Sequence, residues 1–291
     1  MNKKSVKTST ILKIIFASLS LVLLTTIVVL LSKPELLYQI QGKWLRPDQE
    51  YSTFKMIKPK GKLIEYDFSA EQDLDYEQSL MLVNQSHRLP QDFVPQMAEY
   101  KDSGVQMNVA MLDAYAKLSE SVTQKTDDYL YVSSVYRTDE EQGILHAEDP
   151  DYALPAGHSE HQTGLAADVY VYEHAGMAFL ESEAGKYVNQ SCYDFGFIIR
   201  YPEGKEEITK IPFEPWHLRY VGLPHSKIIQ QKFISFEEYI DLLEPGKFYR
   251  YQNYLITRQE ISSKINLPQD LKNIVCSPDN TGHLIITGEY N

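Results

Sequence analysis

The sequence predicts an α+β domain with a mainly antiparallel sheet, preceded by one transmembrane helix. Three observations support this prediction. The composition is globular, with 43% hydrophobic and 23% charged residues among 291, a length that allows one or two ordinary domains. Short strand-like segments are mixed irregularly with helical ones, instead of alternating with them as in a parallel α/β fold. One long, uncharged apolar segment lies near the N-terminus.

The apolar segment 14–32 is 19 residues long and contains no charged side chain. A helix of this length would extend about 28 Å, close to the roughly 30 Å hydrocarbon core of a bilayer. We therefore expect an uncleaved membrane anchor. A cleaved signal peptide is the alternative, although no small-x-small cleavage site follows the segment. The lysines in residues 1–13 predict a cytoplasmic tail and an exported body.

The net charge limits the partners of the chain. There are 28 Lys and Arg residues against 40 Asp and Glu residues, which gives a formal net charge of -12. Because no acidic residue precedes Glu35, the exported body is more acidic than this average. Such a body repels nucleic-acid phosphates and anionic lipid headgroups. We expect no nucleic-acid partner, and a membrane attachment through the apolar helix alone.

Scattered proline, glycine and charge predict that residues 33–75 form a stalk, so that the compact domain spans 76–245. Its first clear element is an amphipathic helix over 108–124, where apolar side chains recur at spacings of three and four. Aromatic and β-branched residues predict a strand over 129–136. The later predicted elements are strands over 164–172, 195–199 and 216–221, a helix over 178–192, and a helix over 235–243 with Ser235 as N-cap.

The tail 246–291 differs in character from the domain before it. Segments 248–256 and 283–290 resemble strands around a polar stretch, which predicts a small β-rich appendage or an added edge on the core sheet. The chain has two cysteines, Cys192 and Cys276, too few for a zinc–cysteine module. They are either two buried thiols or, in an exported domain, one disulfide.

Two sequence segments contain the candidate metal-binding and catalytic residues: SEHQTGLAAD at 159–168 and FEPWH at 213–217. Asp168 lies within an alternating strand, and a carboxylate on an inward strand face needs a partner. A divalent metal is one such partner. His161 and His217 could then supply nitrogen ligands and Asp168 an oxygen ligand. Three protein ligands leave the open fourth position that is typical of catalytic zinc.

Glu214, three residues before His217, could serve as a general base. Pro215 disfavours a regular helix, so we expect the pair on an extended or turning segment. This would place a carboxylate beside the metal without making it a ligand. Zinc lowers the pKa of bound water to about 7, and the water then needs a base to take its proton.

Arg137 stands at the end of its predicted strand. A guanidinium there could hold a carboxylate or stabilise an oxyanion, and Gln142 could share that work. An ordinary salt bridge for Arg137 and a surface position for Gln142 are the alternatives that these two residues alone leave open.

The pattern S-x-H-x-x-G-x-A-x-D followed by E-x-x-H resembles the signature of the zinc D,D-peptidases. More specifically, it is similar to the VanY-type D-alanyl-D-alanine carboxypeptidases of vancomycin-resistance clusters, over roughly residues 76–245. Further strings support the resemblance: SVYR at 134–137, ALPAGHSEH at 153–161, GFIIRYP at 196–202 and EPWHLRYVG at 214–222. The resemblance implies the α+β fold of these enzymes, which is related to the hedgehog N-terminal domain.

The resemblance also implies a role for each motif residue. One Zn2+ per chain would be bound by His161, Asp168 and His217. Glu214 would act as general base, and later as acid toward the leaving amine. Arg137 would polarise the scissile carbonyl and stabilise the tetrahedral oxyanion.

Ser159 and Gln142 would help to hold the C-terminal end of the peptide, again by resemblance. Two positions near Arg137 depart from the family pattern: Val135 stands where the family commonly has Gly, and Thr138 where it has Ser. Neither is a ligand, so we expect altered packing there and not a loss of activity.

The implied function is removal of the terminal D-alanine from peptidoglycan pentapeptide precursors. This depletes the D-Ala-D-Ala ending that glycopeptide antibiotics bind, and so contributes to resistance. The partner is then a peptidoglycan stem peptide ending in D-alanine. The implied location is the bacterial cell membrane, as a single-pass protein with an extracytoplasmic catalytic domain.

Three alternative functions differ from this reading. An L,D-carboxypeptidase would act on the tetrapeptide stem with the same chemistry. An Fe(II) oxygenase would also use two histidines and one carboxylate, but it needs no general-base Glu. A non-catalytic peptidoglycan-binding module would be expected to lack a ligand or the base, whereas all four residues are present here.

Overall fold

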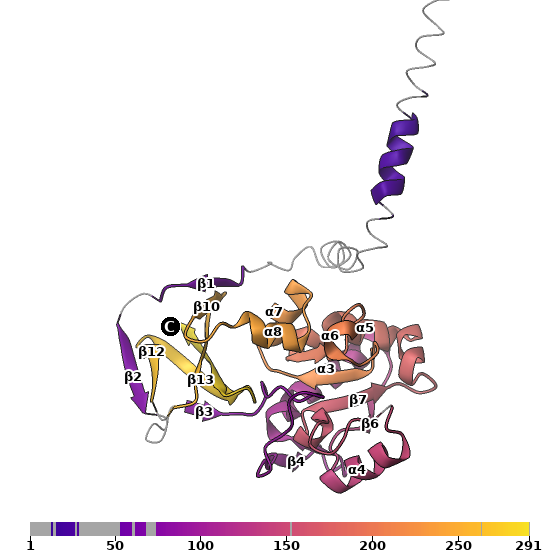
Figure 1. Cartoon of the computed structure of the whole chain (residues 1–291). Helices are drawn as coiled ribbons and strands as arrows, with labels where there is room; N and C mark the ends of the chain where they lie inside the picture. Colours follow the sequence, from indigo (N-terminus) through magenta and orange to yellow (C-terminus); the bar gives the residue numbers. More distant parts are fainter. Residues whose placement is uncertain are drawn as a thin grey trace, which may run out of the picture. The chain divides into compact units, whose positions relative to one another are not determined.

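The chain forms two compact units, Met1–Tyr51 and Ser52–Asn291. The computed structural model in Figure 1 describes residues 13, 16–26, 28, 53–59, 62–67, 74–151, 153–262 and 264–290. In the first unit, residues 13, 16–26 and 28 are helical. Among the described residues, no helix is both long and apolar enough to cross a membrane. The predicted anchor 14–32 lies partly outside the described residues and stays a prediction.

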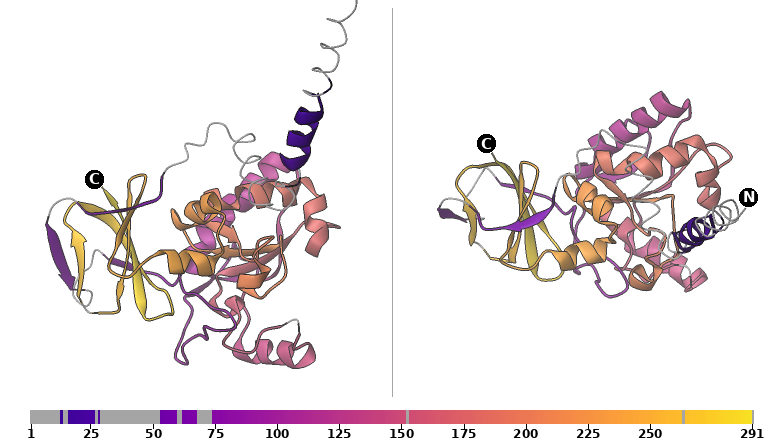
Figure 2. Two further views of the ribbon diagram at one scale, coloured as in Figure 1. Left: turned by 45° about the horizontal axis from the view of Figure 1, so that its top comes forward. Right: turned by 90° about the horizontal axis from the view of Figure 1, so that it is seen from above.

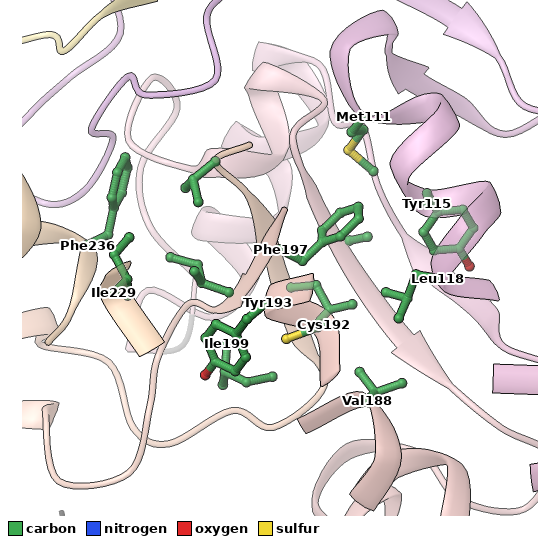
Figure 3. Packing of buried hydrophobic residues seen from close by; sticks show 14 of the residues in the cluster. Met111, Tyr115, Leu118, Val188, Cys192, Tyr193, Phe197, Ile199, Ile229 and Phe236 are labelled. Atoms are coloured by element: carbon green, nitrogen blue, oxygen red, sulfur yellow. The ribbon is translucent and has the colours of Figure 1, made fainter. Parts of the chain in front are cut away.

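A four-stranded sheet forms the centre of the region 76–245, and every pair in it is antiparallel, as predicted. Its strands are, in spatial order, β6 (Tyr131–Ser134), β7 (Ala166–Tyr170), β9 (His217–Tyr220) and β8 (Phe197–Ile199). The sheet shares a large hydrophobic core with helices α3 (Val109–Thr126) and α5 (Glu183–Ser191) (Figure 3). The α+β class is therefore confirmed for this region.

Side chains alternate along β7. Ala167 and Val169 join the hydrophobic core, whereas Asp168 between them faces the opposite side of the sheet. This second face is also largely buried, as predicted: the Asp168 side chain is 19% exposed, and Ala166 on the same face is fully buried.

The helix predicted over 235–243 begins where its N-cap residue predicts, whereas the helix predicted over 178–192 is divided in two. Helix α8 (Phe236–Leu242) begins after Ser235, whose Oγ accepts the N–H of Glu238 at 3.2 Å, as predicted. The helix predicted over 178–192 is instead a 3-10 helix, η2 (Gly176–Glu181), followed by α5. Gly185 permits this break, because a Cβ there would lie 1.8 Å from the carbonyl oxygen of Phe179.

The remaining elements of this region are short. They are β4 (Met97–Glu99), β5 (Gln106–Asn108), α4 (Asp139–Glu148), η1 (Glu160–Thr163), η3 (Cys192–Phe195), α6 (Glu206–Thr209) and α7 (His225–Lys232). Strands β4 and β5 form an antiparallel pair that leads directly into α3.

A six-stranded sheet is formed by the tail together with strands that precede the central region. Its spatial order is β1 (Lys55–Ile57), β10 (Phe248–Tyr251), β11 (Tyr254–Glu260), β14 (His283–Tyr290), β13 (Leu271–Pro278) and β3 (Leu74–Tyr76). Strands β2 (Leu63–Asp67) and β12 (Lys264–Pro268) form a separate antiparallel pair. Figure 2 shows the tail strands together at one end of the unit.

This sheet corrects two predictions. The second half of the predicted stalk 33–75 contributes strands: β1 pairs with β10, β2 with β12 and β3 with β13. The compact unit therefore begins at Ser52 and not near Tyr76. The tail 246–291 is β-rich, as predicted, and it is not an edge of the core sheet, but it is not an appendage of its own, since earlier strands complete its sheets.

The two cysteines are free and buried, so the two-thiol reading holds. Cys192 packs in the main core near Val188 and Phe197 (Figure 3). Cys276 belongs to a different hydrophobic cluster, built from residues of the six-stranded sheet and β12.

A buried ion pair ties this sheet to helix α8. Arg258 of β11 donates from Nε to Asp279 at 2.6 Å, and its Nη1 donates to the carbonyl oxygens of Ile240 and Leu243 at 3.1 and 3.2 Å. The Asp279 side chain is fully buried. The pair therefore connects the last helix of the central region to the sheet of the tail.

We expect Asp279→Asn to lower the free energy of unfolding by roughly 3 kcal/mol, because it leaves the buried Arg258 guanidinium without its counter-charge. Urea unfolding of the full chain would measure the change. Asp102→Asn, at an exposed turn, is the matched control and should have little effect. Equal stability of the two variants would contradict this role for the ion pair.

Candidate metal centre

Three potential metal ligands converge on the face of the four-stranded sheet that Asp168 occupies. Asp168 in β7 and His217 in β9 are direct cross-strand partners, and His161 lies in η1, just before β7. His161 Nε2 is 3.2 Å from Asp168 Oδ2, and His217 Nδ1 is 2.9 Å from Asp168 Oδ1. One ligand atom from each residue lies within 4.8 Å of the others. The structure thus brings together the three residues that the sequence predicts as ligands.

The protonation states of His161 and Asp168 suit a metal. His161 Nδ1 donates to the carbonyl oxygen of Val135 at 2.7 Å, so the lone pair lies on Nε2, facing Asp168. Burial lowers the pKa of His161, which favours the neutral ring that a metal requires. Burial raises the pKa of Asp168, but His217 and His161 outweigh it and keep the carboxylate ionised. Two imidazole nitrogens and a carboxylate oxygen form a donor set that fits catalytic Zn2+.

Glu214 lies beside the ligands without belonging to their group. Its Oε2 is 3.5 Å from His217 Nδ1, and its backbone N–H donates to the carbonyl oxygen of Tyr201 at 3.0 Å. The segment before β9 is not helical, as Pro215 predicts. Burial raises the pKa of Glu214 above its ordinary value; Asp168 adds to this rise, and His217 opposes it. A carboxylate with a raised pKa is suited to accept a proton and return it.

Arg137 follows β6 and is fixed by Gln142 in α4. Arg137 Nη1 donates to Gln142 Oε1 at 2.7 Å, and Gln142 Nε2 donates to the carbonyl oxygen of Leu154 at 2.5 Å. Thr138 is the N-cap of α4, and its Oγ1 accepts the N–H of Glu141 at 3.2 Å. A serine hydroxyl can form the same cap, so the departure from the family pattern at Thr138 leaves the helix start intact.

Gln142 is buried and both ends of its amide are bonded within the protein. This favours a role in holding Arg137 over the direct contact with substrate that the resemblance implies. We expect Gln142→Ala to lower kcat/KM roughly tenfold, because it removes a hydrogen bond to a charged group, while zinc stays bound. Steady-state kinetics and metal analysis would measure both. Unchanged kcat/KM would show that Arg137 does not need this partner.

Ser159 and His158 stand just before η1. Ser159 is buried, and its backbone N–H donates to Gln162 Oε1 at 3.4 Å. Its role in holding the peptide stays a prediction. His158 is not part of the ligand group, and its Nδ1 donates to the carbonyl oxygen of Asn84 at 2.8 Å.

Sequence reasoning assigned no role to a set of buried residues around the ligands. Glu160 is next to His161 in the chain. Arg200 and Arg219 are fully buried, and both form ion pairs with Glu160. The Tyr201 ring packs 4.9 Å from the His217 ring. One signal was available: an arginine directly after the buried apolar strand β8 requires a carboxylate partner. The sequence does not say which carboxylate that is.

Comparisons with known proteins agree with this geometry. Residues 104–223 match the VanY family, described as D-alanyl-D-alanine carboxypeptidase. A D-alanyl-D-alanine carboxypeptidase of Enterococcus faecium is 32% identical over 238 residues, which cover 73% of this chain and 75% of that protein. The bifunctional D-Ala-D-Ala dipeptidase and carboxypeptidase VanXYC of Enterococcus gallinarum is 35% identical, over 57% of this chain and 95% of its own length.

Solved structures extend the comparison to the fold. The D,D-dipeptidase VanXYg, with a D-Ala-D-Ala phosphinate analogue, covers 81% of this chain and 99% of its own length at a TM-score of 0.63 and 24% identity. A VanY mutant from a VanB-type resistance cassette, in complex with Zn(II), is 29% identical over 56% of this chain and 99% of its own, with a TM-score of 0.51. The LD-carboxypeptidase LdcB is 30% identical over 64% of this chain and 93% of its own length, also with a TM-score of 0.51.

Proposed function

Because this chain belongs to the VanY family of D-alanyl-D-alanine carboxypeptidases, we propose that it removes the terminal D-alanine from peptidoglycan pentapeptide precursors. We further propose that one Zn2+ per chain is held by His161, Asp168 and His217. The observation that supports this most directly is the convergence of these three donors with Glu214 beside them, 3.5 Å from His217 Nδ1.

Zinc, when bound, would activate a water molecule and polarise the scissile carbonyl. Glu214 would take the proton of the attacking water, and its raised pKa suits it to return that proton to the leaving D-alanine nitrogen. The Arg137 guanidinium, held by Gln142, would stabilise the negative charge that develops on the carbonyl oxygen. Water is consumed, the peptide bond breaks, and a shortened peptide and free D-alanine are released.

An L,D-carboxypeptidase is the second candidate, because the similarity to LdcB is as strong as that to the zinc-bound VanY structure. Incubating the full chain with UDP-linked pentapeptide and tetrapeptide, with and without a chelator, separates the two. We expect chelator-sensitive release of one D-alanine from the pentapeptide, stopping at the tetrapeptide. Release from the tetrapeptide alone would establish the L,D-enzyme. No release from either would contradict both proposals.

We also propose that the protein is a single-pass membrane protein with an extracytoplasmic catalytic domain and that it contributes to glycopeptide resistance. The uncharged segment 14–32 supports the first point, and the similarity to a VanY from a resistance cassette supports the second. Cell fractionation tests the anchor, since a full chain recovered in the soluble fraction would contradict it. Unchanged vancomycin susceptibility on expression would contradict the resistance role.

A further inference from the structure

Glu160 occupies a position that the motif S-x-H leaves open, yet it adjoins one predicted zinc ligand in the chain and approaches another in space. It precedes His161 in the chain, and its buried carboxylate faces His217. Oε1 accepts hydrogen bonds from Arg200 Nε at 2.7 Å and from Arg219 Nη1 at 2.8 Å. Oε2 is buried, has no hydrogen bond among the described residues, and lies 3.8 Å from His217 Nε2.

His217 supplies a hydrogen-bond donor that faces the Glu160 carboxylate. Its Nδ1 faces Asp168 at 2.9 Å, so this nitrogen is the metal-binding one and the ring proton belongs on Nε2. Nε2 is also buried and has no hydrogen bond among the described residues. The rings of His161 and Tyr201, 5.1 and 4.9 Å away between ring centres, pack against the imidazole. A buried donor and a buried acceptor therefore face each other with a gap of less than 1 Å to close.

The two arginines hold Glu160 as a fixed, ionised acceptor. Both guanidinium groups form ion pairs with this one buried carboxylate, so its negative charge is balanced within the protein and its position is fixed. Arg219 is held in turn by the carbonyl oxygens of Ser79 and Met81, at 3.0 and 2.9 Å. Because both guanidinium groups bond to Oε1, the free oxygen Oε2 is the one directed at His217.

Arg200 also binds a second carboxylate, Glu237, at 2.6 and 3.0 Å. Glu237 accepts a hydrogen bond from Asn84 Nδ2 at 3.1 Å, and among the described residues it forms no hydrogen bond or ion pair with either histidine. The network thus contains two carboxylates on the same buried arginine, and only Glu160 faces a metal ligand. This gives a matched pair of positions for an experiment.

We propose that Glu160 is a positioning residue for the metal centre, whose Oε2 accepts the Nε2–H of His217 and so fixes the orientation and tautomer of that ligand. Such a hydrogen bond also makes Nδ1 a stronger donor to the metal, and its loss typically weakens metal binding 10- to 100-fold. The inference rests on the proposed function only in requiring that His217 binds zinc.

The test compares Glu160→Gln with Glu237→Gln in the full chain. Both substitutions remove one negative charge from the same buried arginine, so both should reduce stability in urea unfolding. Zinc affinity is measured by competition with a chromophoric chelator. We expect zinc to bind roughly 10- to 100-fold more weakly to Glu160→Gln, and with near wild-type affinity to Glu237→Gln. Equal zinc affinity in the two variants would overturn the proposal.

A second measurement does not depend on the variants folding. In zinc-loaded wild-type protein with 15N-labelled histidine, the Nε2–H of His217 should give a slowly exchanging, downfield proton resonance. Its coupling pattern distinguishes it from the Nδ1–H of His161, which is bonded to Val135. If His217 showed no protected Nε2–H, or bound zinc through Nε2, the proposal would fail. A wild-type protein that binds no zinc would instead refute the proposed function.

Discussion

Glu214→Gln is expected to lower kcat by at least about 100-fold while zinc remains bound, because general-base assistance is typically worth roughly 10²–10⁴ in rate. The amide keeps the shape and most of the packing of the side chain, but it cannot accept the proton of the attacking water. Glu214 is not among the three residues whose ligand atoms converge, so its replacement should leave the metal site intact.

The rate of D-alanine release from a D-Ala-D-Ala peptide, measured together with zinc content, checks this prediction. Glu207→Gln is a suitable control, since this exposed carboxylate of α6 lies in the preceding segment and should have no effect. A Glu214→Gln protein that keeps zinc and turns over at the wild-type rate would assign the general base to another group. If neither the wild-type protein nor the variant released D-alanine, a binding module would be favoured over an enzyme.

His161→Ala is expected to abolish both zinc binding and activity. The substitution removes one of the three ligands and leaves a space beside Asp168. The two remaining ligands would not hold the metal ion. Zinc affinity should fall by more than the roughly 100-fold that loss of a hydrogen-bonding partner of a ligand can cause.

The neighbouring residue provides the matched control for this variant. His158→Ala also removes an imidazole from the same loop, but His158 is bonded to the carbonyl oxygen of Asn84 and is not among the ligands. We expect it to retain stoichiometric zinc by metal analysis. If His161→Ala also retained stoichiometric zinc, the assignment of His161 as a ligand would be wrong.

The ligand group could be predicted from the sequence because its members follow local rules. The alternation of β7 separates Asp168 from the apolar residues on either side of it, and Pro215 keeps the segment before His217 out of a helix. The resemblance supplied the roles of these residues. The structure adds that Asp168 and His217 are cross-strand partners, which fixes their approach.

Features that depend on distant residues could not be predicted in the same way. Strands β1 and β3 have three residues each, too few to show a period, and both pair with strands of the tail. Glu160 seemed only a neighbour of His161, because its arginine partners lie 40 and 59 residues later. Gln142 was predicted to contact the substrate, whereas the structure places its amide between Arg137 and a carbonyl oxygen of the following loop.

The proposed function requires that one zinc ion, bound by His161, Asp168 and His217, supports D-Ala-D-Ala carboxypeptidase activity. The most direct test is to titrate zinc into the metal-free full chain while following D-alanine release from a D-Ala-D-Ala peptide. We expect no release at the start, a linear rise with added zinc, and a plateau at one equivalent per chain. Release by the metal-free protein, or a plateau only at two equivalents, would contradict this requirement.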